Sequence, residues 1–238
     1  LKLGGTLVTT TAAELNLLDG GTSVGSSITI ADADGFVVND GGTMKTIPAS
    51  DISTYAGGGA WTHIVTKTAS DSAYIDFVDG ASSVVFDNTY NLYVIICQSL
   101  RMPNNAALNA TTSNDGGSGY ETVYDFSGLT LTSTDDSAES PSASYTDSEA
   151  EMIMNISSFG SASGRCGSFT MYISSPSDTD TYHHIWGLGS SNDDNGFARA
   201  HYFTGFHETA EAFDAIKFTP SSGNIVDGTF SLYGLATS

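Results

Sequence analysis

The sequence predicts an all-β protein whose larger part is an antiparallel β-sandwich. Gly, Ser, Thr, Asp and Asn are abundant, whereas Lys and Glu, which are typical of helix surfaces, are scarce. Several short stretches alternate apolar and polar residues, which is the pattern of strands with one buried face. About ten such stretches follow one another with turn residues between them, at the spacing found in two-sheet sandwiches.

Two parts are expected: an extended stalk segment at residues 1–59 and the sandwich at 60–238. The first part contains only small polar pieces, interrupted by connectors at 21–27 and 57–59. Such pieces cannot bury a core of their own. We therefore expect this part to be either disordered or stabilised by wrapping around symmetry-related copies.

A short capped helix is expected at 11–20. Thr11 and Glu14 have the spacing of a capping box, and Gly20 suits the left-handed residue just past a helix end. A helix of this length is marginal alone in water, so its apolar residues need a partner. Because none lies nearby in sequence, copies of the same stretch from neighbouring chains would supply this partner. The residues expected at that contact are Leu15, Leu17 and Leu18.

The rest of the first part is expected to hold short strands and one helical turn. The strands are expected at 28–30, 36–38 and 43–47. The helical turn is expected at 48–55, with Ser50 as its cap.

The strands of the second part follow from the apolar pattern. The run 90–97 is the strongest apolar run in the chain and predicts a central strand buried on both faces. Two further stretches alternate apolar and polar residues and predict strands with one buried face. Their apolar members are Met152, Met154 and Ile156 in one and Phe169, Met171 and Ile173 in the other. Other strands are expected at 61–68, 73–78, 120–126, 129–131, 182–188 and 197–206, with a closing hairpin at 215–218 and 228–235.

Two stretches of the second part are expected to lack regular strands. Residues 104–119 have the composition of a loop or sheet edge, with Leu108 as the one large apolar anchor. Residues 132–149 are polar, acidic and rich in Ser, which favours a long excursion on the surface.

The two cysteines, Cys97 and Cys166, lie in apolar strand-like runs, so we expect two buried thiols. A disulfide or a metal-binding pair is the alternative. Neither cysteine lies in a CxxC motif, so no zinc site is predicted.

The charge of the chain limits its partners. Seven Lys and Arg stand against 27 Asp and Glu, which gives a formal net charge of -20. Such a surface repels nucleic acid backbones and anionic membranes, so neither is expected as a partner. No apolar run is long enough to insert across a bilayer, and no basic segment precedes an apolar one as in a signal peptide. Because the first residue is Leu1 rather than Met, we expect a fragment or a processed product.

The stretch 8–20, which reads VTTTAAELNLLDG, resembles a repeat unit of tail-fibre-like proteins of marine tailed bacteriophages, notably those of cyanobacteria. The stretches 28–35 and 37–44 resemble the segment that joins such repeats to a distal domain. Only one copy of the repeat is present, where several in tandem are usual. The strand at 167–173 and the end of the chain at 215–235 resemble the jelly-roll-like sandwich domains of phage fibre and decoration proteins. The resemblance implies a jelly-roll-like sandwich for the second part.

The resemblance also implies a function, that of a structural virion protein without enzymatic activity or a cofactor. The chain would be the distal segment of a tail fibre, a homotrimer on the virion surface, extracellular and in contact with other virion fibre or tail proteins. It would bind a host cell-surface glycan through several weak non-covalent sites that act together. A capsid decoration or head-fibre protein is one alternative. A cellular carbohydrate-binding protein or surface filament subunit is another.

Enzyme signatures are absent from the sequence. It contains no G-x-S-x-G elbow, P-loop or H-E-x-x-H motif. A glycosidase pair remains an alternative, because two carboxylates can meet in space from distant parts of a chain.

Glycan recognition uses aromatic rings that stack on sugar faces and polar groups that bind sugar hydroxyls. We expect this ligand-binding role at Trp186, Tyr182, Tyr120, Asn192 and Asp193. The same residues also suit a core or a subunit contact.

No metal site is predicted. His183 and His184 are adjacent and face opposite sides of a strand, so they cannot both bind one metal. A site would need distant partners such as His201 or His207. Three acidic loops offer oxygen ligands for Ca²⁺, at 114–116, 178–180 and 192–195. They lack EF-hand spacing, and turns closed by Asp and Asn side chains explain them as well.

Overall fold

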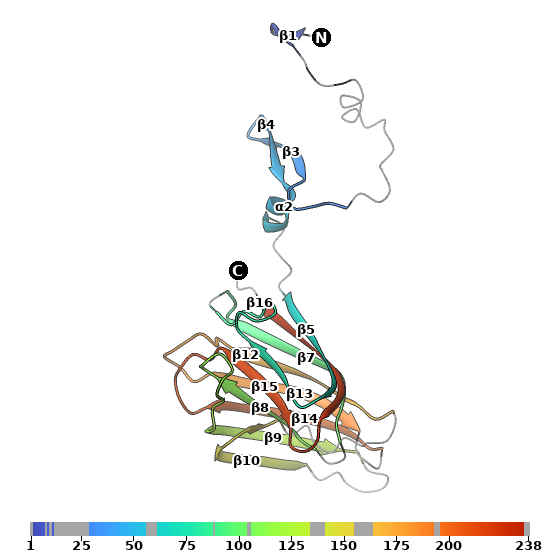
Figure 1. The fold of residues 1–238 in the computed structure, drawn as a ribbon, viewed down its shortest axis with the longest axis vertical. Coiled ribbons are helices and arrows are strands. Elements are labelled where there is room, and N and C mark those ends of the chain that lie inside the picture. The colour runs from blue at the N-terminus through green and yellow to red at the C-terminus, as the bar shows by residue number, and fades with distance from the viewer. Residues whose placement is uncertain are drawn as a thin grey trace. The chain divides into compact units, whose positions relative to one another are not determined.

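The computed structural model describes most of the chain. The described residues are 2–7, 9, 11, 29–55, 61–87, 89–103, 106–133, 141–154, 164–192 and 196–235. The chain divides into two compact units, Leu1–Gly57 and Gly58–Ser238, and both are drawn in Figure 1. The predicted fold class is confirmed, because the structure is nearly all β and its large antiparallel sheets pack as a sandwich.

The first unit contains two short hairpins and one helix among its described residues. The strands are β1 (Lys2–Leu3), β2 (Thr6–Leu7), β3 (Gly35–Asp40) and β4 (Thr43–Pro48), and α2 (Ala49–Tyr55) follows β4 directly. β1 pairs with β2, and β3 pairs with β4 so that Asp40 lies opposite Thr43. The two residues between them are Gly41 and Gly42, both with positive φ. Glycine suits this two-residue turn because its backbone matches the twist of the flanking strands.

Two of the three strands expected in this unit form the β3–β4 hairpin. The third expectation is wrong where the structure describes it, since Thr29 and Ile30 are exposed and lie outside any strand. The expected helical turn is present as α2. Because α2 begins at Ala49, Ser50 lies inside the first turn rather than at the position before it.

The capped helix expected at 11–20 lies outside the described residues, except for Thr11. The same holds for the proposed contact residues Leu15, Leu17 and Leu18 and for the connectors. The threefold contact therefore stays a prediction from sequence.

The second unit is a sandwich of two antiparallel sheets (Figure 1). In the described part of the chain, the large sheet has eight strands in the order β10-β9-β14-β13-β12-β7-β16-β5. They are β5 (Trp61–Ser72), β7 (Leu92–Arg101), β9 (Tyr124–Thr132), β10 (Ser142–Glu149), β12 (Gly167–Ser174), β13 (His184–Asn192), β14 (Ala198–His207) and β16 (Ile225–Leu235). The small sheet has the order β11-β8-β15-β6. Its strands are β6 (Ile75–Val78), β8 (Leu108–Ser113), β11 (Met152–Ile153) and β15 (Ala215–Pro220).

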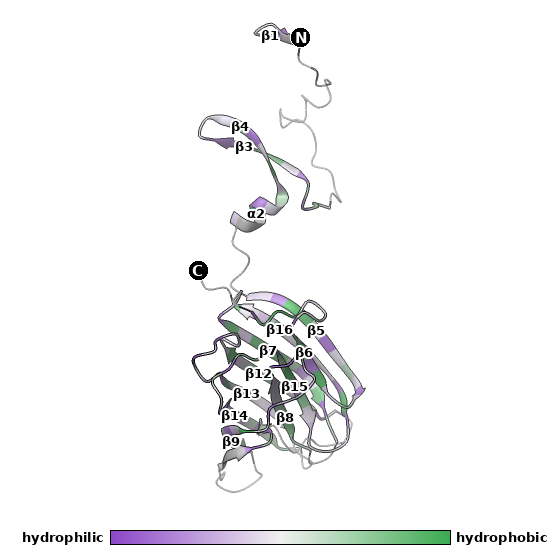
Figure 2. Ribbon diagram, turned by 60° about the vertical axis from the view of Figure 1, so that its left-hand side comes forward, coloured by the Kyte–Doolittle hydropathy of each residue, from purple (hydrophilic) through white to green (hydrophobic). Residues whose placement is uncertain are grey.

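Four buried phenylalanines join the two sheets, and we call them the phenylalanine cluster. The ring centroid of Phe169 in β12 lies 5.8 Å from that of Phe218 in the small sheet and 6.0 Å from that of Phe230 in β16. The ring centroid of Phe203 in β14 lies 6.5 Å from that of Phe169. Figure 2 shows the hydrophobic residues along the strands that enclose this core. Tilted and edge-on ring pairs of this kind add stabilisation beyond the buried area itself.

Gly187 makes room for the phenylalanine cluster. In the strand register it lies between Met171 and Phe203, two core residues. A Cβ atom at this position would lie 2.4 Å from Cζ of Phe203 and 2.2 Å from the carbonyl oxygen of Thr170. Glycine is therefore required here by the close approach of a neighbouring ring and backbone.

Strand alternation is confirmed where the sequence pattern was clearest. In β12, buried residues alternate with half-exposed ones, as predicted from Phe169 and its apolar neighbours. The predicted central strand is β7, in which Tyr93, Val94 and Ile95 are fully buried. In the other stretch predicted to alternate, Met152 and Met154 are buried, whereas Ile156 lies outside the described residues.

The expected closing hairpin is wrong, because β15 and β16 belong to different sheets. β15 lies between β8 and β6 in the small sheet, and β16 lies between β7 and β5 in the large sheet. Each strand has one buried face, with Phe218 on β15 and Phe230 on β16. A hairpin would place both rings on the same sheet. Instead, the two rings meet in the core from opposite sheets.

Two stretches expected to lack strands contain them. Leu108 begins β8, an inner strand of the small sheet whose residues are all buried. β10 occupies the end of 132–149 and is an edge strand of the large sheet. The sequence of β10 is polar, which suits an edge strand and explains why it resembles a surface loop. The two strands expected between 120 and 131 are one strand, β9, because Ser127 and Gly128 stay in the ladder.

The expectation of two buried thiols holds for one cysteine only. Cys97 is fully buried in β7, and this burial raises the pKa of its thiol. Cys166 is exposed and precedes β12, so the prediction is wrong for it. The apolar run that follows Cys166 belongs to the strand, whose first buried residue is Gly167. Both cysteines are free thiols.

Replacing Phe169 by Ala is expected to lower the free energy of unfolding of the second unit by about 3–5 kcal/mol. The ring contacts three others, so its removal leaves a cavity between the sheets that neither sheet closes. Urea unfolding measures the change. The matched control is Tyr145→Ala, whose ring is 82% exposed and whose loss is expected to cost less than about 0.5 kcal/mol. Equal losses in the two variants would contradict the central position of Phe169.

Candidate functional site

The outer face of the large sheet carries one row of side chains that crosses all eight described strands. Strand pairing places these residues opposite one another in the order Tyr145, Ser127, Thr204, Trp186, Tyr172, Val94, Tyr233 and His63. We call them the ring row. Their neighbours along the strands, such as Phe203 and Ile185, belong to the core, so the row faces away from it. With strands about 4.8 Å apart, the row is about 34 Å long.

Several rings on this face pack against one another. Tyr172 and Trp186 are stacked, with centroids 5.5 Å apart and an interplanar angle of 14°. Beside the row, Tyr182 stacks on Phe206 at 5.4 Å and 7°. His184 lies 5.3 Å from the same Phe206 ring. Trp186 remains 38% exposed and Tyr182 48% exposed, so these rings are open to a ligand.

Small residues in the row create a depression beside Tyr145. Ser127 and Thr204, which lie in its wall, occupy the two row positions between Tyr145 and Trp186. The depression has a volume of about 470 Å³, and its wall also includes Asp125, Phe206 and His184. A second depression of about 420 Å³ shares Ser127 and Thr204 and reaches Tyr202. Hydroxyl, carboxylate and imidazole groups thus lie among exposed rings, an arrangement that fits a ligand with both apolar faces and hydroxyl groups.

The structure separates the five residues predicted to bind a ligand. Trp186 and Tyr182 lie on the face just described. Tyr120 lies away from it, beside β15 of the small sheet, where Nζ of Lys217 is 3.5 Å from its ring centroid. Burial, with a smaller effect of Asp76, raises the pKa of Tyr120 to about 12. Asn192 ends β13 and lines another depression, together with Cys166 and Arg199. Asp193 lies outside the described residues.

Sequence reasoning missed the other rings of this face. They are Tyr145, Tyr172, Tyr202, Tyr233 and Phe206. In β14 the residues Tyr202 and Phe203 are consecutive, so the strand has aromatic residues on both faces. Hydrophobic alternation identifies the strand, but it does not tell which of the two rings is exposed. Tyr145 lay in a stretch expected to be a loop.

The histidines do not form a common site. His183 and His184 point to opposite sides, as predicted: His183 is 3% exposed, and His184 is exposed on the outer face. Nε2 of His183 lies 2.7 Å from the carbonyl oxygen of Glu211. His201 is fully buried, and its Nε2 lies 2.8 Å from the Ser191 hydroxyl. These contacts give both buried rings a structural role.

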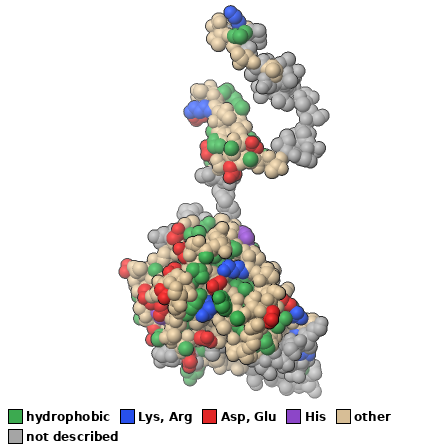
Figure 3. All heavy atoms as spheres, viewed as in Figure 1, with side chains coloured by type: hydrophobic (Ala, Val, Ile, Leu, Met, Phe, Trp, Pro, Cys, Tyr) green, Lys and Arg blue, Asp and Glu red, His purple; other side chains and the backbone are tan. Residues whose placement is uncertain are grey.

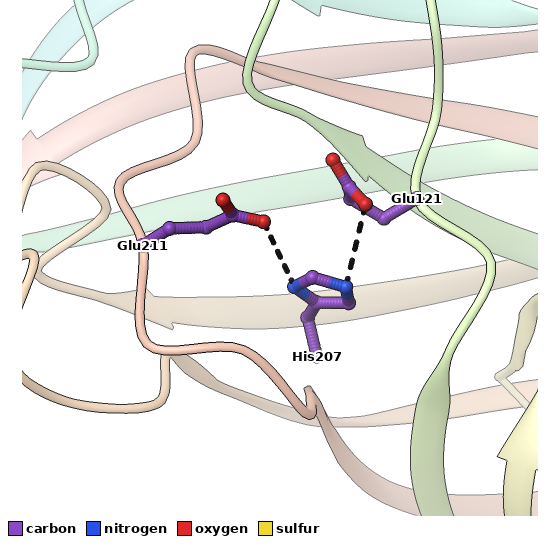
Figure 4. A group of neighbouring side chains, drawn as sticks. All are labelled: Glu121, His207 and Glu211. Atoms are coloured by element: carbon purple, nitrogen blue, oxygen red, sulfur yellow. Dashed lines mark ion pairs between the residues drawn. The ribbon is translucent and has the colours of Figure 1, made fainter.

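His207 lies between two carboxylates, as Figure 4 shows. Its Nε2 is 3.5 Å from an oxygen of Glu121, and its Nδ1 is 3.7 Å from an oxygen of Glu211. One ligand atom from each residue lies within 4.8 Å of the others, which is close enough for a metal ion. The carboxylates face different ring nitrogens, however, and a metal binds only one nitrogen of a ring. The two carboxylates therefore lie beside opposite nitrogens of the ring rather than around one ion.

Two of the three acidic loops are turns closed by their own side chains. Asp115 accepts hydrogen bonds from the Gly119 N–H, at 2.7 Å, and the Ser113 hydroxyl, at 2.8 Å. Asp178 accepts them from the Asp180 N–H, at 2.8 Å, and the Thr181 hydroxyl, at 3.0 Å. These bonds lower the pKa of both carboxyl groups. In the third loop, Asn192 alone is described.

The turn closed by Asp178 makes a pH-dependent contribution to the stability of the second unit. The backbone N–H of Asp180 is the main cause of the lowered pKa of Asp178. Its stabilising effect is therefore present above the usual carboxyl pKa of about 3.9 and is lost as the pH falls through the lower folded-state value. We expect Asp178→Asn to lower the melting temperature at pH 7, with the difference from wild type shrinking below about pH 4. Thermal unfolding across this range measures it, and a difference independent of pH would contradict the assignment.

Comparison with known proteins assigns no family to this chain. No family model, curated protein or solved structure matches it. Within the described residues, no helix has the length and apolar character needed to cross a membrane. The candidate site therefore depends on the geometry of the outer sheet face.

Proposed function

We propose that the sandwich is a glycan-binding domain and that the outer face of its large sheet holds the glycan. The observation that carries this proposal is the depression beside Tyr145, whose wall holds the rings of Tyr145 and Phe206 together with the polar groups of Asp125 and His184. Sugar rings present C–H groups on their faces and hydroxyl groups at their edges. Aromatic side chains contact the faces, and groups such as Asp125 and His184 bind the hydroxyls.

The rigidity of the face supports binding of an extended ligand. The rings project from paired strands, and several of them stack on one another. Little conformational entropy is therefore lost when a ligand settles on them. A row about 34 Å long has room for several sugar units of a surface polysaccharide.

The charge of the protein favours a ligand without phosphate groups. The net charge is -20, and Figure 3 shows Asp and Glu side chains scattered over the visible face of the sandwich. Such a surface repels nucleic acids and anionic lipids. A neutral glycan is bound through contacts that do not depend on opposite charge.

The biological setting of the proposal comes from the resemblance of the first quarter of the chain to phage tail-fibre repeats. We propose that the chain is the distal, extracellular segment of a tailed-phage fibre and forms a homotrimer. A trimer would present three glycan-binding faces on one fibre, and their weak affinities would combine through effective concentration. The proposed role is binding without cleavage of the glycan.

Glycan binding is tested with an array of bacterial surface polysaccharides and with intact host cells. Trp186→Ala and Tyr145→Ala are each expected to weaken binding at least about tenfold, the loss of one important contact. Tyr74→Ala is the matched control, because its ring is 52% exposed and lies outside the ring row. Equal binding by all variants would exclude this face as the site. Failure of the wild type to bind any glycan or cell would favour a decoration protein, and release of sugar fragments would indicate an enzyme.

The proposed trimer is tested independently by light scattering. The double variant Leu15→Asp, Leu18→Asp is expected to reduce the mass from that of three chains to that of one, because charge repulsion replaces the apolar contact. The circular dichroism of the sandwich is expected to stay unchanged. A wild-type chain that is monomeric at micromolar concentration would contradict the trimer but leave the glycan site untouched.

A further inference from the structure

A pocket of about 350 Å³ lies over β8 and β15 of the small sheet, beside the edge where the chain passes from β10 to β11. We call it the edge pocket. Its wall includes Asn109 and Thr111 of β8, Glu121, Glu149, Glu151 and Lys217. Glu149 ends β10 of the large sheet, and Glu151 precedes β11 of the small sheet. The pocket therefore lies where the chain crosses from one sheet to the other.

Two buried oxygen atoms in the edge pocket have no hydrogen-bond partner among the described residues. They are Oδ1 of Asn109 and Oγ1 of Thr111, in residues that are 7% and 6% exposed. The Asn109 amide nitrogen donates to the Glu151 carboxylate. Because a carboxylate only accepts, the amide is oriented with its nitrogen toward Glu151, which leaves its oxygen unpaired.

Strand alternation directs these two oxygens to the pocket. The neighbouring residue Thr112 points to the core, where its hydroxyl lies 3.2 Å from the Tyr124 hydroxyl. Asn109 and Thr111 therefore project from the opposite face of β8. Buried polar oxygens without a partner are costly, so a pair of them aimed at one pocket indicates a ligand that they contact.

The charge of the edge pocket matches a divalent cation. Three carboxylates, of Glu121, Glu149 and Glu151, lie in its wall with the single ammonium group of Lys217. The carboxylates thus exceed the ammonium by two charges. Nζ of Lys217 lies 3.5 Å from the centroid of the Tyr120 ring, which already contacts this positive charge.

The donor atoms of the edge pocket select the type of cation. An amide oxygen, a hydroxyl and carboxylates are hard oxygen ligands, which suit calcium and magnesium, and the wall contains no thiol or imidazole. Calcium accepts six to eight oxygens in a flexible arrangement, whereas magnesium requires a compact octahedron. Oxygens from three separate chain segments in a pocket of this size fit the calcium pattern. We propose that the edge pocket binds a calcium ion.

Calcium in the edge pocket would join parts of the chain that are distant in sequence. Glu149 lies opposite Tyr124 at the edge of the large sheet. Three residues after Glu149 the chain pairs with β8, where Met152 lies opposite Ala110. Glu121 is fixed beside β8 by its N–H, which donates to the Thr112 carbonyl oxygen at 2.9 Å. One ion would therefore hold the edges of both sheets together and raise the stability of the sandwich.

Titration calorimetry with CaCl₂ tests the proposal on chain stripped with EDTA, at constant ionic strength. We expect one site with a Kd on the order of 0.1–1 mM, the range of extracellular calcium modules, and weaker binding of MgCl₂. The melting temperature is expected to rise with CaCl₂ and not with NaCl of equal ionic strength. Absence of saturable binding at about ten times this concentration would overturn the proposal.

Three variants and one control test whether calcium binds at the edge pocket or only screens the negative charge of the protein surface. Thr111→Val keeps the shape of the side chain and its charge but removes one oxygen, so it is expected to weaken calcium binding at least about tenfold. In EDTA the same variant is expected to melt at or above the wild-type temperature, because the unpaired hydroxyl is gone. Glu151→Gln is expected to weaken binding similarly. Lys217→Met is expected to strengthen binding, because a competing positive charge is removed.

The control variant is Asp180→Asn, which removes an exposed carboxylate outside the edge pocket. It is expected to bind calcium as the wild type does. Equal weakening by Asp180→Asn and Glu151→Gln would show that calcium only screens the surface and would overturn the proposal. A large loss of stability by Thr111→Val in EDTA would do the same, because it would show that the hydroxyl has a structural partner.

Discussion

The phenylalanine cluster is the contact on which the rest of the sandwich depends. Phe218 comes from the small sheet, and Phe169, Phe203 and Phe230 come from three strands of the large sheet. Because side chains alternate along a strand, the residues before and after each inward ring point to the outer face of the sheet. Burial of Phe203 thereby exposes Tyr202 and Thr204. The outer face is thus a consequence of how the core is packed.

The two proposed sites use the two sheets in different ways. The large sheet is wide and its outer face carries rings, so it suits an extended ligand that is held by many weak contacts. The small sheet has short strands, and its edge pocket collects oxygen atoms from β8 and from the crossover between the sheets. Both sites depend on Glu149 and Tyr145 lying on one edge strand, β10, which links the ring row to the edge pocket. A change that detaches β10 would disturb both sites.

Local patterns predicted the strands whose burial is one-sided or complete. The alternation around Phe169 predicted β12, and the apolar run 90–97 predicted β7. Both patterns reflect burial along a single strand, so they can be recognised without knowing which strands pair. Patterns failed where pairing over long range decided the outcome. β8 has the polar residues Asn109, Thr111 and Ser113 on one face and was expected to be a loop or sheet edge, yet β15 and β11 pair with it on both sides. β15 and β16 are close in sequence, but the need for apolar residues in both layers of the core places them in different sheets.

The sequence by itself determined the fold class, the residues that share a face within each strand, and the strongly negative surface. Composition and a period of two residues carry this information, because both are local. Only the tertiary structure decided which strands are neighbours, and with them the ring row and the edge pocket. Trp186 and Tyr182 were identifiable as aromatic residues near a turn, but Tyr145 joins them only through the pairing of β10, β9, β14 and β13. That pairing is set by the packing of the whole core, which no single stretch of sequence specifies.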